Sequence, residues 1–139
     1  VCSSDLKMSR GAALDDTDRA PWLDRLGTEL ARRVHEGRDV VLACSALKRS
    51  YRDRLRGVCP TLCFVHLRGD PQLIRARLAE RRGHFMPAGL MESQFAALEE
   101  PGADEMAIVV EVRAPAGRLA AELAQRIAGT GRQPVASRI

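Results

Sequence analysis

The chain has 139 residues, of which 45% are hydrophobic and 29% are charged, and its net charge is +4. This length is typical of one domain, and no run of residues is long and apolar enough for a transmembrane helix or placed as in a signal peptide. The positive charge fits either a polyanionic partner or, since Lys7 and Lys48 are the only lysines, a composition that simply favours arginine.

The four cysteines include no CxxC pair and no histidine at zinc spacing. This favours a reduced, cytoplasmic protein without a metal site. A disulfide between Cys59 and Cys63, which flank Pro60, is the alternative.

The first predicted helix covers residues 15–37. Aspartates at its start suit the N-cap and the first turn, Pro21 is tolerable in the first turn only, and Gly37 ends the helix. Apolar residues three and four positions apart indicate one buried face: Trp22, Leu23, Leu26, Leu30 and Val34.

Short apolar runs without clean alternation predict strands that are covered on both faces, as in parallel sheets. They lie at residues 39–45, 61–67 and 107–112. Helical patterns alternate with these runs, at residues 49–56, 70–82, 89–99 and 116–128. Such alternation predicts an α/β domain, a parallel sheet with helices on both faces. The polar tail from Gly129 is expected to fray.

Basic residues follow the predicted strand 39–45 directly, at the edge where α/β sheets bind ligands. Lys48 and Arg52 are four positions apart, and Arg56 continues the same row, so these side chains are candidates to bind one anion. The alternative is a solvated helix in which Arg52 and Asp53 form surface ion pairs.

A second basic cluster runs from Arg75 to Phe85, and within it Arg77 and Arg81 are again four apart. Glycines and Pro87 beyond them predict a mobile flap, and arginines on a flap suit bidentate binding of transferring phosphates. Simple helix solvation is the alternative. His84 would either contact a ligand or cap a helix end.

The acidic cluster of Asp15, Asp16 and Asp18, followed by Arg19, allows three interpretations. It would bind polyol hydroxyls, hold a metal ion, or only cap the helix. Capping is the leading interpretation, because no histidine or further carboxylate supports a metal site.

Three stretches carry a resemblance: KMSRGAALDDTDRAPWL, CSALKRSYRDRLR and RRGHFMPAGLMESQFAALEEPGADE. Together they resemble the gluconate kinase (gluconokinase) family of small P-loop kinases, which are similar to shikimate and nucleoside-monophosphate kinases. The resemblance runs from about Lys7 to Ile127. It implies phosphorylation of D-gluconate to 6-phosphogluconate by ATP with Mg²⁺. It implies neither a nucleic-acid nor a membrane partner, and homodimers are common in that family.

The resemblance also implies roles for individual residues. Lys48 and Arg52 would balance the gluconate carboxylate or the incoming phosphate, and Asp18 and Arg19 would shape the sugar-acid pocket. Lid contacts to the ATP phosphates are implied for Arg77, Arg81 and Arg82. Catalytic roles are implied for Lys48, Arg52 and Arg81. Contacts to substrate hydroxyls are implied for His84 and Gln94.

The chain departs from the family pattern at its start, where GxxxxGK[ST] and the first two strands of the family are lacking. We therefore expect an N-terminally truncated domain at residues 7–128, with an artefactual start at residues 1–6 and a flexible tail at residues 129–139. This chain alone is expected to be inactive and of little stability.

Two rival functions remain open from the sequence. One is a kinase of another small sugar acid or hydroxy acid. The other is a non-enzymatic, basic nucleic-acid-binding module, which would need stacking aromatic residues among its basic ones, where only Tyr51 stands.

Overall fold

The structure of the protein is a computed structural model that describes residues 14–80 and 88–129. Its helices are α2 (Asp16–His35), α3 (Arg49–Val58), α4 (Pro71–Glu80), α5 (Ala88–Ala97), the short 3-10 helix η1 (Ala103–Glu105) and α6 (Ala116–Gly129). Its strands are β1 (Val65–Arg68) and β2 (Ile108–Glu111). These elements confirm the predicted helices in order and approximate extent. The predicted start at residues 1–6 lies outside the described residues. So does the predicted tail at residues 129–139, apart from Gly129, which is the last residue of α6.

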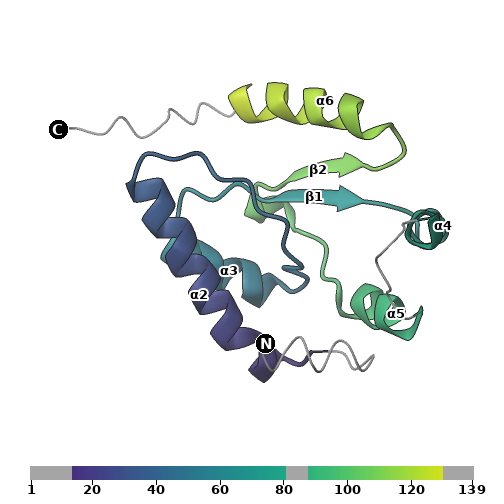
Figure 1. Ribbon diagram of the computed structural model, residues 1–139, viewed down its shortest axis with the longest axis horizontal. Coiled ribbons are helices and arrows are strands. Elements are labelled where there is room, and N and C mark those ends of the chain that lie inside the picture. Colours follow the sequence, from purple (N-terminus) through teal and green to yellow (C-terminus); the bar gives the residue numbers. More distant parts are fainter. Residues whose placement is uncertain (1–13, 81–87, 130–139) are drawn as a thin grey trace.

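The sheet consists of β1 and β2 in parallel, in a register that runs from Val65 opposite Ile108 to Arg68 opposite Glu111. In Figure 1, α6 lies on one side of this sheet, and α2 and α3 lie on the other. Arg126 of α6 donates a hydrogen bond of 2.8 Å to the Val109 carbonyl of β2. The predicted parallel α/β arrangement is therefore confirmed.

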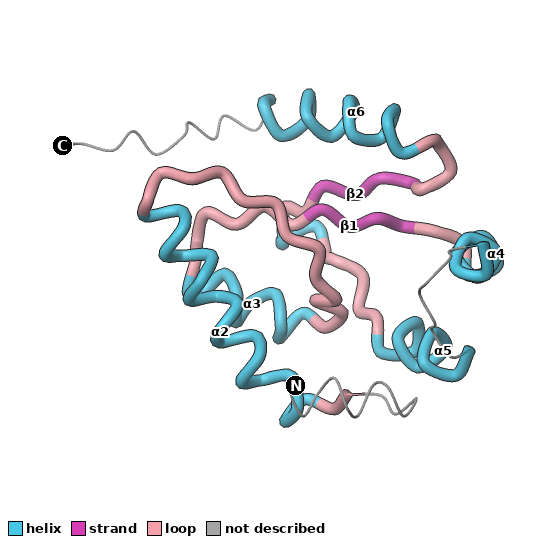
Figure 2. Tube along the Cα trace, in the orientation of Figure 1, coloured by secondary structure: helices cyan, strands magenta, loops and turns pink. Residues whose placement is uncertain are grey.

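The prediction of a strand at residues 39–45, the first of the three in chain order, is wrong. This segment forms part of the long loop between α2 and α3 (Figure 2), and the Val41 side chain is fully exposed. A strand exists only through hydrogen bonds to a neighbour, and among the described residues β1 and β2 pair only with each other. The apolar run thus has strand-forming residues without a strand partner.

Helix α2 begins and ends at clear sequence signals. Asp15 is its N-cap and forms a capping box with Asp18, as the acidic start predicted. At the other end Gly37 adopts a φ of +71°, and the amides of Gly37 and Arg38 donate to the carbonyls of Val34 and Arg33. Pro21 lies beyond the first turn, contrary to the expectation, where it removes one donor from the helix.

The core beneath the site forms between α2 and α3. Leu23, Tyr51 and Leu55 are buried there, and half-buried residues from the following loops pack against them. Gly27 permits a close approach of the two helices, since a Cβ at this position would lie 3.2 Å from the Cβ of Val58. This packing brings the N-terminus of α2 beside that of α3.

Three cysteines lie in the described residues, and all three are free thiols: Cys44, Cys59 and Cys63. The alternative of a disulfide between Cys59 and Cys63 is therefore wrong. Burial raises the pKa of the Cys44 thiol, which packs against the core. Over residues 14–80 and 88–129, none of the helices combines the length and the apolar character that a membrane span requires.

Candidate functional site

A cleft of about 400 Å³ opens where the N-termini of α2 and α3 meet α5. Its volume falls in the range of small-molecule sites, about 300–1,000 Å³. It is lined by Leu14, Asp15, Asp16, Thr17, Arg19, Leu47, Lys48, Tyr51, Ser93, Gln94 and Ala97. Three residues to which the resemblance assigned a site role thus lie together, Arg19, Lys48 and Gln94, with Asp15 and Asp16 of the acidic cluster beside them.

Asp16, Lys48 and Tyr51 form a hydrogen-bonded cluster on the wall of the cleft. The Lys48 ammonium lies 2.6 Å from Oδ1 and 2.9 Å from Oδ2 of Asp16, and the Tyr51 hydroxyl donates to Oδ1 as well. These bonds from Lys48 and Tyr51 lower the pKa of Asp16, and Asp16 in turn raises the pKa of Lys48. Burial, followed by the bond to Asp16, raises the pKa of Tyr51. The carboxylate and the ammonium therefore both stay charged near neutral pH.

Lys48 points toward α2 because it is the N-cap of α3 and not a helical residue. Its backbone is extended, with φ −93° and ψ 151°. An N-cap side chain leaves the helix at a different angle from the helical rows, so the spacing of four to Arg52 does not place the two side chains on one face. The structure does not bring Lys48 and Arg52 together on one anion.

Arg19 forms the second cationic wall of the cleft and is 8% exposed. Its guanidinium donates to the carbonyls of Leu14 and Ser45 at 3.4 and 3.5 Å, which ties the start of α2 to the loop before α3. It also lies 5.8 Å from the centre of the Tyr51 ring, and the Lys48 ammonium lies 5.6 Å from the same centre. Tyr51 thus contacts both cations of the cleft.

Asp18, which the resemblance placed in the sugar-acid pocket, does not line the cleft. Its carboxylate accepts from the Asp15 amide at 3.0 Å, and Asp15 accepts from the Asp18 amide at 2.9 Å. Asp16 faces Lys48 in its place. The described residues contain no group of three or more acidic, histidine or cysteine residues placed to hold a metal ion.

Helix α5 supplies the third wall. Gln94 brings a side-chain amide to the cleft, and Ser93 lies next to it with its hydroxyl donating to the Leu90 carbonyl at 2.8 Å. Both side chains are half-buried. The wall therefore offers polar groups without charge, which suit ligand hydroxyls.

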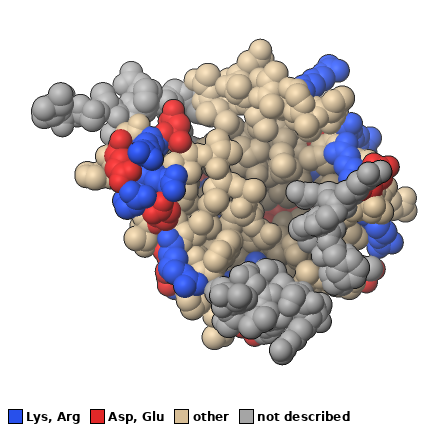
Figure 3. All heavy atoms as spheres, viewed as in Figure 1, with Lys and Arg blue, Asp and Glu red and all other residues tan. Residues whose placement is uncertain are grey.

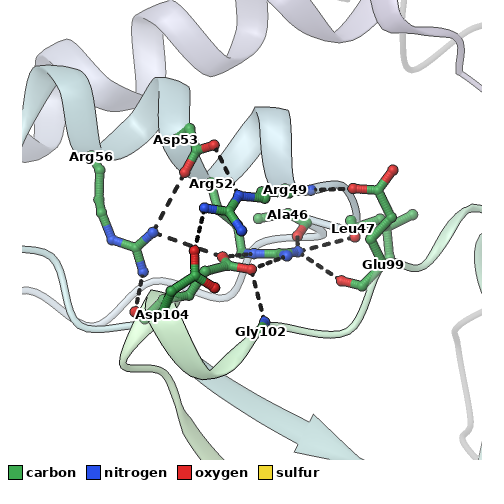
Figure 4. A network of polar contacts seen from close by, with 10 residues as sticks. Ala46, Leu47, Arg49, Arg52, Asp53, Arg56, Glu99, Gly102 and Asp104 are labelled. Atoms are coloured by element: carbon green, nitrogen blue, oxygen red, sulfur yellow. Dashed lines mark hydrogen bonds and ion pairs between the residues drawn. The ribbon is translucent and has the colours of Figure 1, made fainter.

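Arg52 lies outside the cleft, in a network that Figure 4 shows from close by. Its side chain is 3% exposed and bonds through Nε and Nη2 to both carboxylate oxygens of Glu105, at 2.6 and 2.8 Å. Arg56 donates to the Glu105 carbonyl at 2.6 Å. The predicted row of Arg52 and Arg56 is thus real, but the anion that it meets is the protein's own Glu105.

The other basic residues of α3 are also paired. Arg49 reaches Asp104 at 2.5 Å, and Arg54 reaches Asp24 of α2 at 2.6 and 2.7 Å. In the view of Figure 3, acidic and basic atoms likewise lie side by side along α2. Charge in this region is largely compensated within the chain.

The predicted lid is described only in part. Arg77 lies on α4 with its side chain exposed. The other three predicted residues, Arg81, Arg82 and His84, lie outside the described residues.

Sequence reasoning did not assign Asp16 and Tyr51 to the site. Tyr51 stood out only as an aromatic residue among charges, and Asp16 only as one member of an acidic cluster. The one signal that distinguishes Asp16 from Asp18 is the distance from the N-cap: Asp18 is three residues after Asp15 and completes the capping box, whereas Asp16 does not.

Comparison with models of known protein families finds no match. Among curated proteins, the chain is 51% identical over 104 residues to the gluconokinase of Gluconobacter oxydans, covering 75% of this chain and 58% of that protein. It is 46% identical over 125 residues to a probable gluconokinase of Rattus norvegicus, covering 77% of this chain and 68% of that protein. The chain thus spans little more than half the length of the first of these relatives.

Two solved structures are also similar. One is an unliganded sugar kinase from Janibacter sp. HTCC2649, with a TM-score of 0.83 and 41% identity, covering 88% of this chain and 71% of that one. The other is a gluconokinase from Sinorhizobium meliloti 1021, with a TM-score of 0.76 and 39% identity, covering 92% of this chain and 75% of that one. Sequence and structure therefore point to the same group of kinases.

Proposed function

The chain belongs to the gluconokinase family, and from this membership we propose that the whole protein transfers the γ-phosphoryl group of ATP to D-gluconate. The product is 6-phosphogluconate. The cleft between α2, α3 and α5 is the proposed site of the sugar acid.

The observation that carries this proposal is the cluster of Lys48, Asp16 and Tyr51 on the cleft wall. Gluconate has a carboxylate at one end and a row of hydroxyls behind it, so its site needs a cation at one point and neutral or anionic partners along the rest. An ammonium has three donors, and Asp16 holds Lys48 so that a further donor is left for the ligand carboxylate. Arg19 adds positive charge beside it.

The hydroxyls of the sugar acid have partners on the remaining walls. Asp16, Gln94 and the Tyr51 hydroxyl offer acceptor oxygens, and the Gln94 amide offers donors. We therefore place Asp16, Arg19, Lys48, Tyr51 and Gln94 in the acceptor site. Lys48 would also stabilise negative charge that develops during transfer, because positioning and charge neutralisation supply most of the catalysis in phosphoryl transfer.

The nucleotide is proposed to bind elsewhere. Arg77, Arg81 and Arg82 remain the proposed contacts to the ATP phosphates, with Arg81 as the one that acts on the transferred group. The described residues do not fit a Mg²⁺ site, and the 139-residue sequence contains no phosphate-binding glycine loop, so we derive no step through the metal. We accordingly expect this chain alone to turn over no ATP.

The rival functions make different demands on the same residues. A nucleic-acid module needs unpaired cations along a surface, whereas Arg49, Arg52 and Arg54 are each bonded to a carboxylate. This pairing supports a small-molecule site. A kinase of another small sugar acid would use the same cleft, so an activity assay is needed to distinguish it from a gluconate kinase.

The deciding experiment is a coupled assay of the whole protein with MgATP and one acceptor at a time. The acceptors are D-gluconate, shikimate and nucleoside monophosphates. We expect D-gluconate to have the highest kcat/KM. Equal or better turnover of another acceptor would overturn the gluconate assignment.

A further inference from the structure

The network around Arg52 joins α3 to two segments beside the cleft, although Arg52 does not line the cleft itself. Its Nη1 donates to the carbonyls of Ala46 and Leu47 at 3.1 Å each and to that of Glu99 at 3.0 Å. The first two carbonyls lie in the loop that directly precedes Lys48, and the third follows α5. One guanidinium therefore holds the segments that carry Lys48 and Gln94 at a fixed separation.

Glu99 ties the same two segments a second time. Its amide donates to the Leu47 carbonyl at 2.9 Å, and its carboxylate accepts from the Arg49 amide at 2.7 Å. This carboxylate serves the N-terminus of α3, whose N-cap Lys48 makes no side-chain capping bond. The junction of α3 with the end of α5 thus rests on Arg52 and Glu99 together (Figure 4).

Glu105 keeps the guanidinium in place. Its carboxylate is 2% exposed, bonds to Arg52 through both oxygens, and accepts from the Gly102 amide at 3.0 Å. A bidentate pair of this kind fixes the plane of the guanidinium as well as its position. The charge of Arg52 is therefore compensated inside the protein, which leaves Arg52 to set geometry and not to attract a ligand.

We propose that Arg52 and Glu105 are a pair of positioning residues for the acceptor site, which hold Lys48 against the α5 wall. This inference rests on the proposed function. The pair acts through the carbonyls of Ala46, Leu47 and Glu99, and it touches neither substrate. Loss of either partner lets the Lys48 loop move away from Gln94 and widens the cleft.

The test compares Arg52→Lys and Glu105→Gln in the whole protein. Lysine keeps the charge of Arg52 but loses its planar fork, and glutamine keeps the shape of Glu105 but loses the ion pair. Both variants should raise the KM for gluconate by about tenfold or more, while the KM for ATP stays within about twofold. Arg54→Ala is the matched control, because Arg54 lies on the same helix but pairs with Asp24 on an exposed surface.

The outcomes separate three roles of Arg52. A fall in kcat at unchanged gluconate KM in both variants would mean a merely structural pair. A raised gluconate KM in Arg52→Lys alone would mean that Arg52 binds the substrate directly. Either result overturns the proposal.

Amide hydrogen exchange is the second measurement, and it needs no substrate. In Glu105→Gln the amides of Arg49 and Glu99, which donate to Glu99 and Leu47, should exchange faster than in the wild type. The increase should be a larger factor than for the amides of β2 and α6, which report the loss of global stability. An equal factor in both sets, or unchanged exchange at Arg49 and Glu99, would overturn the proposal. Where Glu105→Gln does not fold, Arg52→Lys takes its place in this measurement. If the wild type does not phosphorylate gluconate, the proposed function is refuted. The exchange result would still decide whether Arg52 and Glu105 hold the Lys48 loop in position.

Discussion

The Lys48 ammonium lies 2.6 and 2.9 Å from the two carboxylate oxygens of Asp16, across 32 residues of sequence. This contact joins the first turn of α2 to the N-cap of α3 and forms one wall of the cleft. It also favours the protonated lysine, because Asp16 raises the pKa of Lys48. This wall of the cleft is therefore held in place by contacts within the chain.

Replacement of Lys48 tests the cation of the site. In the whole protein, Lys48→Met should lower kcat/KM for gluconate by about 100-fold, which corresponds to about 2.7 kcal/mol of lost transition-state stabilisation. Methionine keeps an unbranched side chain of nearly the same length and removes the charge. Steady-state kinetics give the ratio, with Arg54→Ala as the control that should stay near the wild type. Equal losses of kcat/KM in both variants would mean that the basic residues of α3 only face solvent and that Lys48 has no specific role.

A pair of isosteric variants distinguishes the two nearby aspartates. Asp16→Asn should lower kcat/KM for gluconate by about tenfold, because Lys48 and Tyr51 lose their anionic partner. Asp18→Asn should have little effect, since asparagine still accepts the capping bond from the backbone. The same kinetic assay compares them. A larger loss in Asp18→Asn than in Asp16→Asn would indicate that Asp18, and not Asp16, contacts the sugar acid.

The Arg52–Glu105 pair makes stability depend on pH. Hydrogen bonds from Arg52 lower the pKa of Glu105 to about 2 from an ordinary value of 4.5. A carboxyl group with a lowered pKa stabilises the folded state fully above its unfolded pKa, and this contribution disappears as the pH falls through the folded pKa. The shift corresponds to at most about 3 kcal/mol at neutral pH.

Denaturant unfolding of the wild type and of Glu105→Gln measures this contribution. At about pH 7 the variant should be less stable by about 3–5 kcal/mol, because it leaves the charge of Arg52 buried without a partner. The difference between the two proteins should shrink below about pH 4, where Glu105 in the wild type begins to be protonated in the unfolded chain. A difference that is constant with pH would show that the ion pair does not contribute.

Two glycines should respond in opposite directions to alanine. A Cβ on Gly69 would lie 2.6 Å from Cγ2 of Val112 and 2.7 Å from Cδ1 of Ile74, so Gly69→Ala should destabilise the fold by about 1–3 kcal/mol. At Gly57 in α3, no atom lies within 4 Å of the added Cβ. Gly57→Ala should therefore stabilise by up to about 1 kcal/mol through helix propensity. Thermal unfolding compares them, and similar melting temperatures would contradict the packing around Gly69.

The helices could be predicted from the sequence because their ends carry local signals. Asp15 at the start of α2, Gly37 after its end and Pro71 at the start of α4 each act through the nearest turn of backbone. The segment 39–45 could not be predicted in this way. Its residues favour a strand, but strand formation depends on a partner that is distant in sequence.

The candidate site could also be predicted only where local sequence signals suffice. The basic segment and the acidic cluster are evident in the sequence, but the choice between Asp16 and Asp18 depends on which of them forms the capping box with Asp15. The role of Arg52 depends on Glu105, which lies 53 residues away. Helical spacing gave the correct row of Arg52 and Arg56, whereas only the tertiary structure shows that this row meets an internal carboxylate.

We propose that the cleft between α2, α3 and α5 holds the sugar acid. Calorimetric titration of D-gluconate into the whole protein tests it most directly, with the wild type and with Ala97→Trp. Ala97 lines the cleft, and tryptophan there would fill the space without changing any charge. We expect saturable gluconate binding by the wild type and its loss in Ala97→Trp, with ATP binding retained in both. Gluconate binding that is unchanged in Ala97→Trp would contradict it.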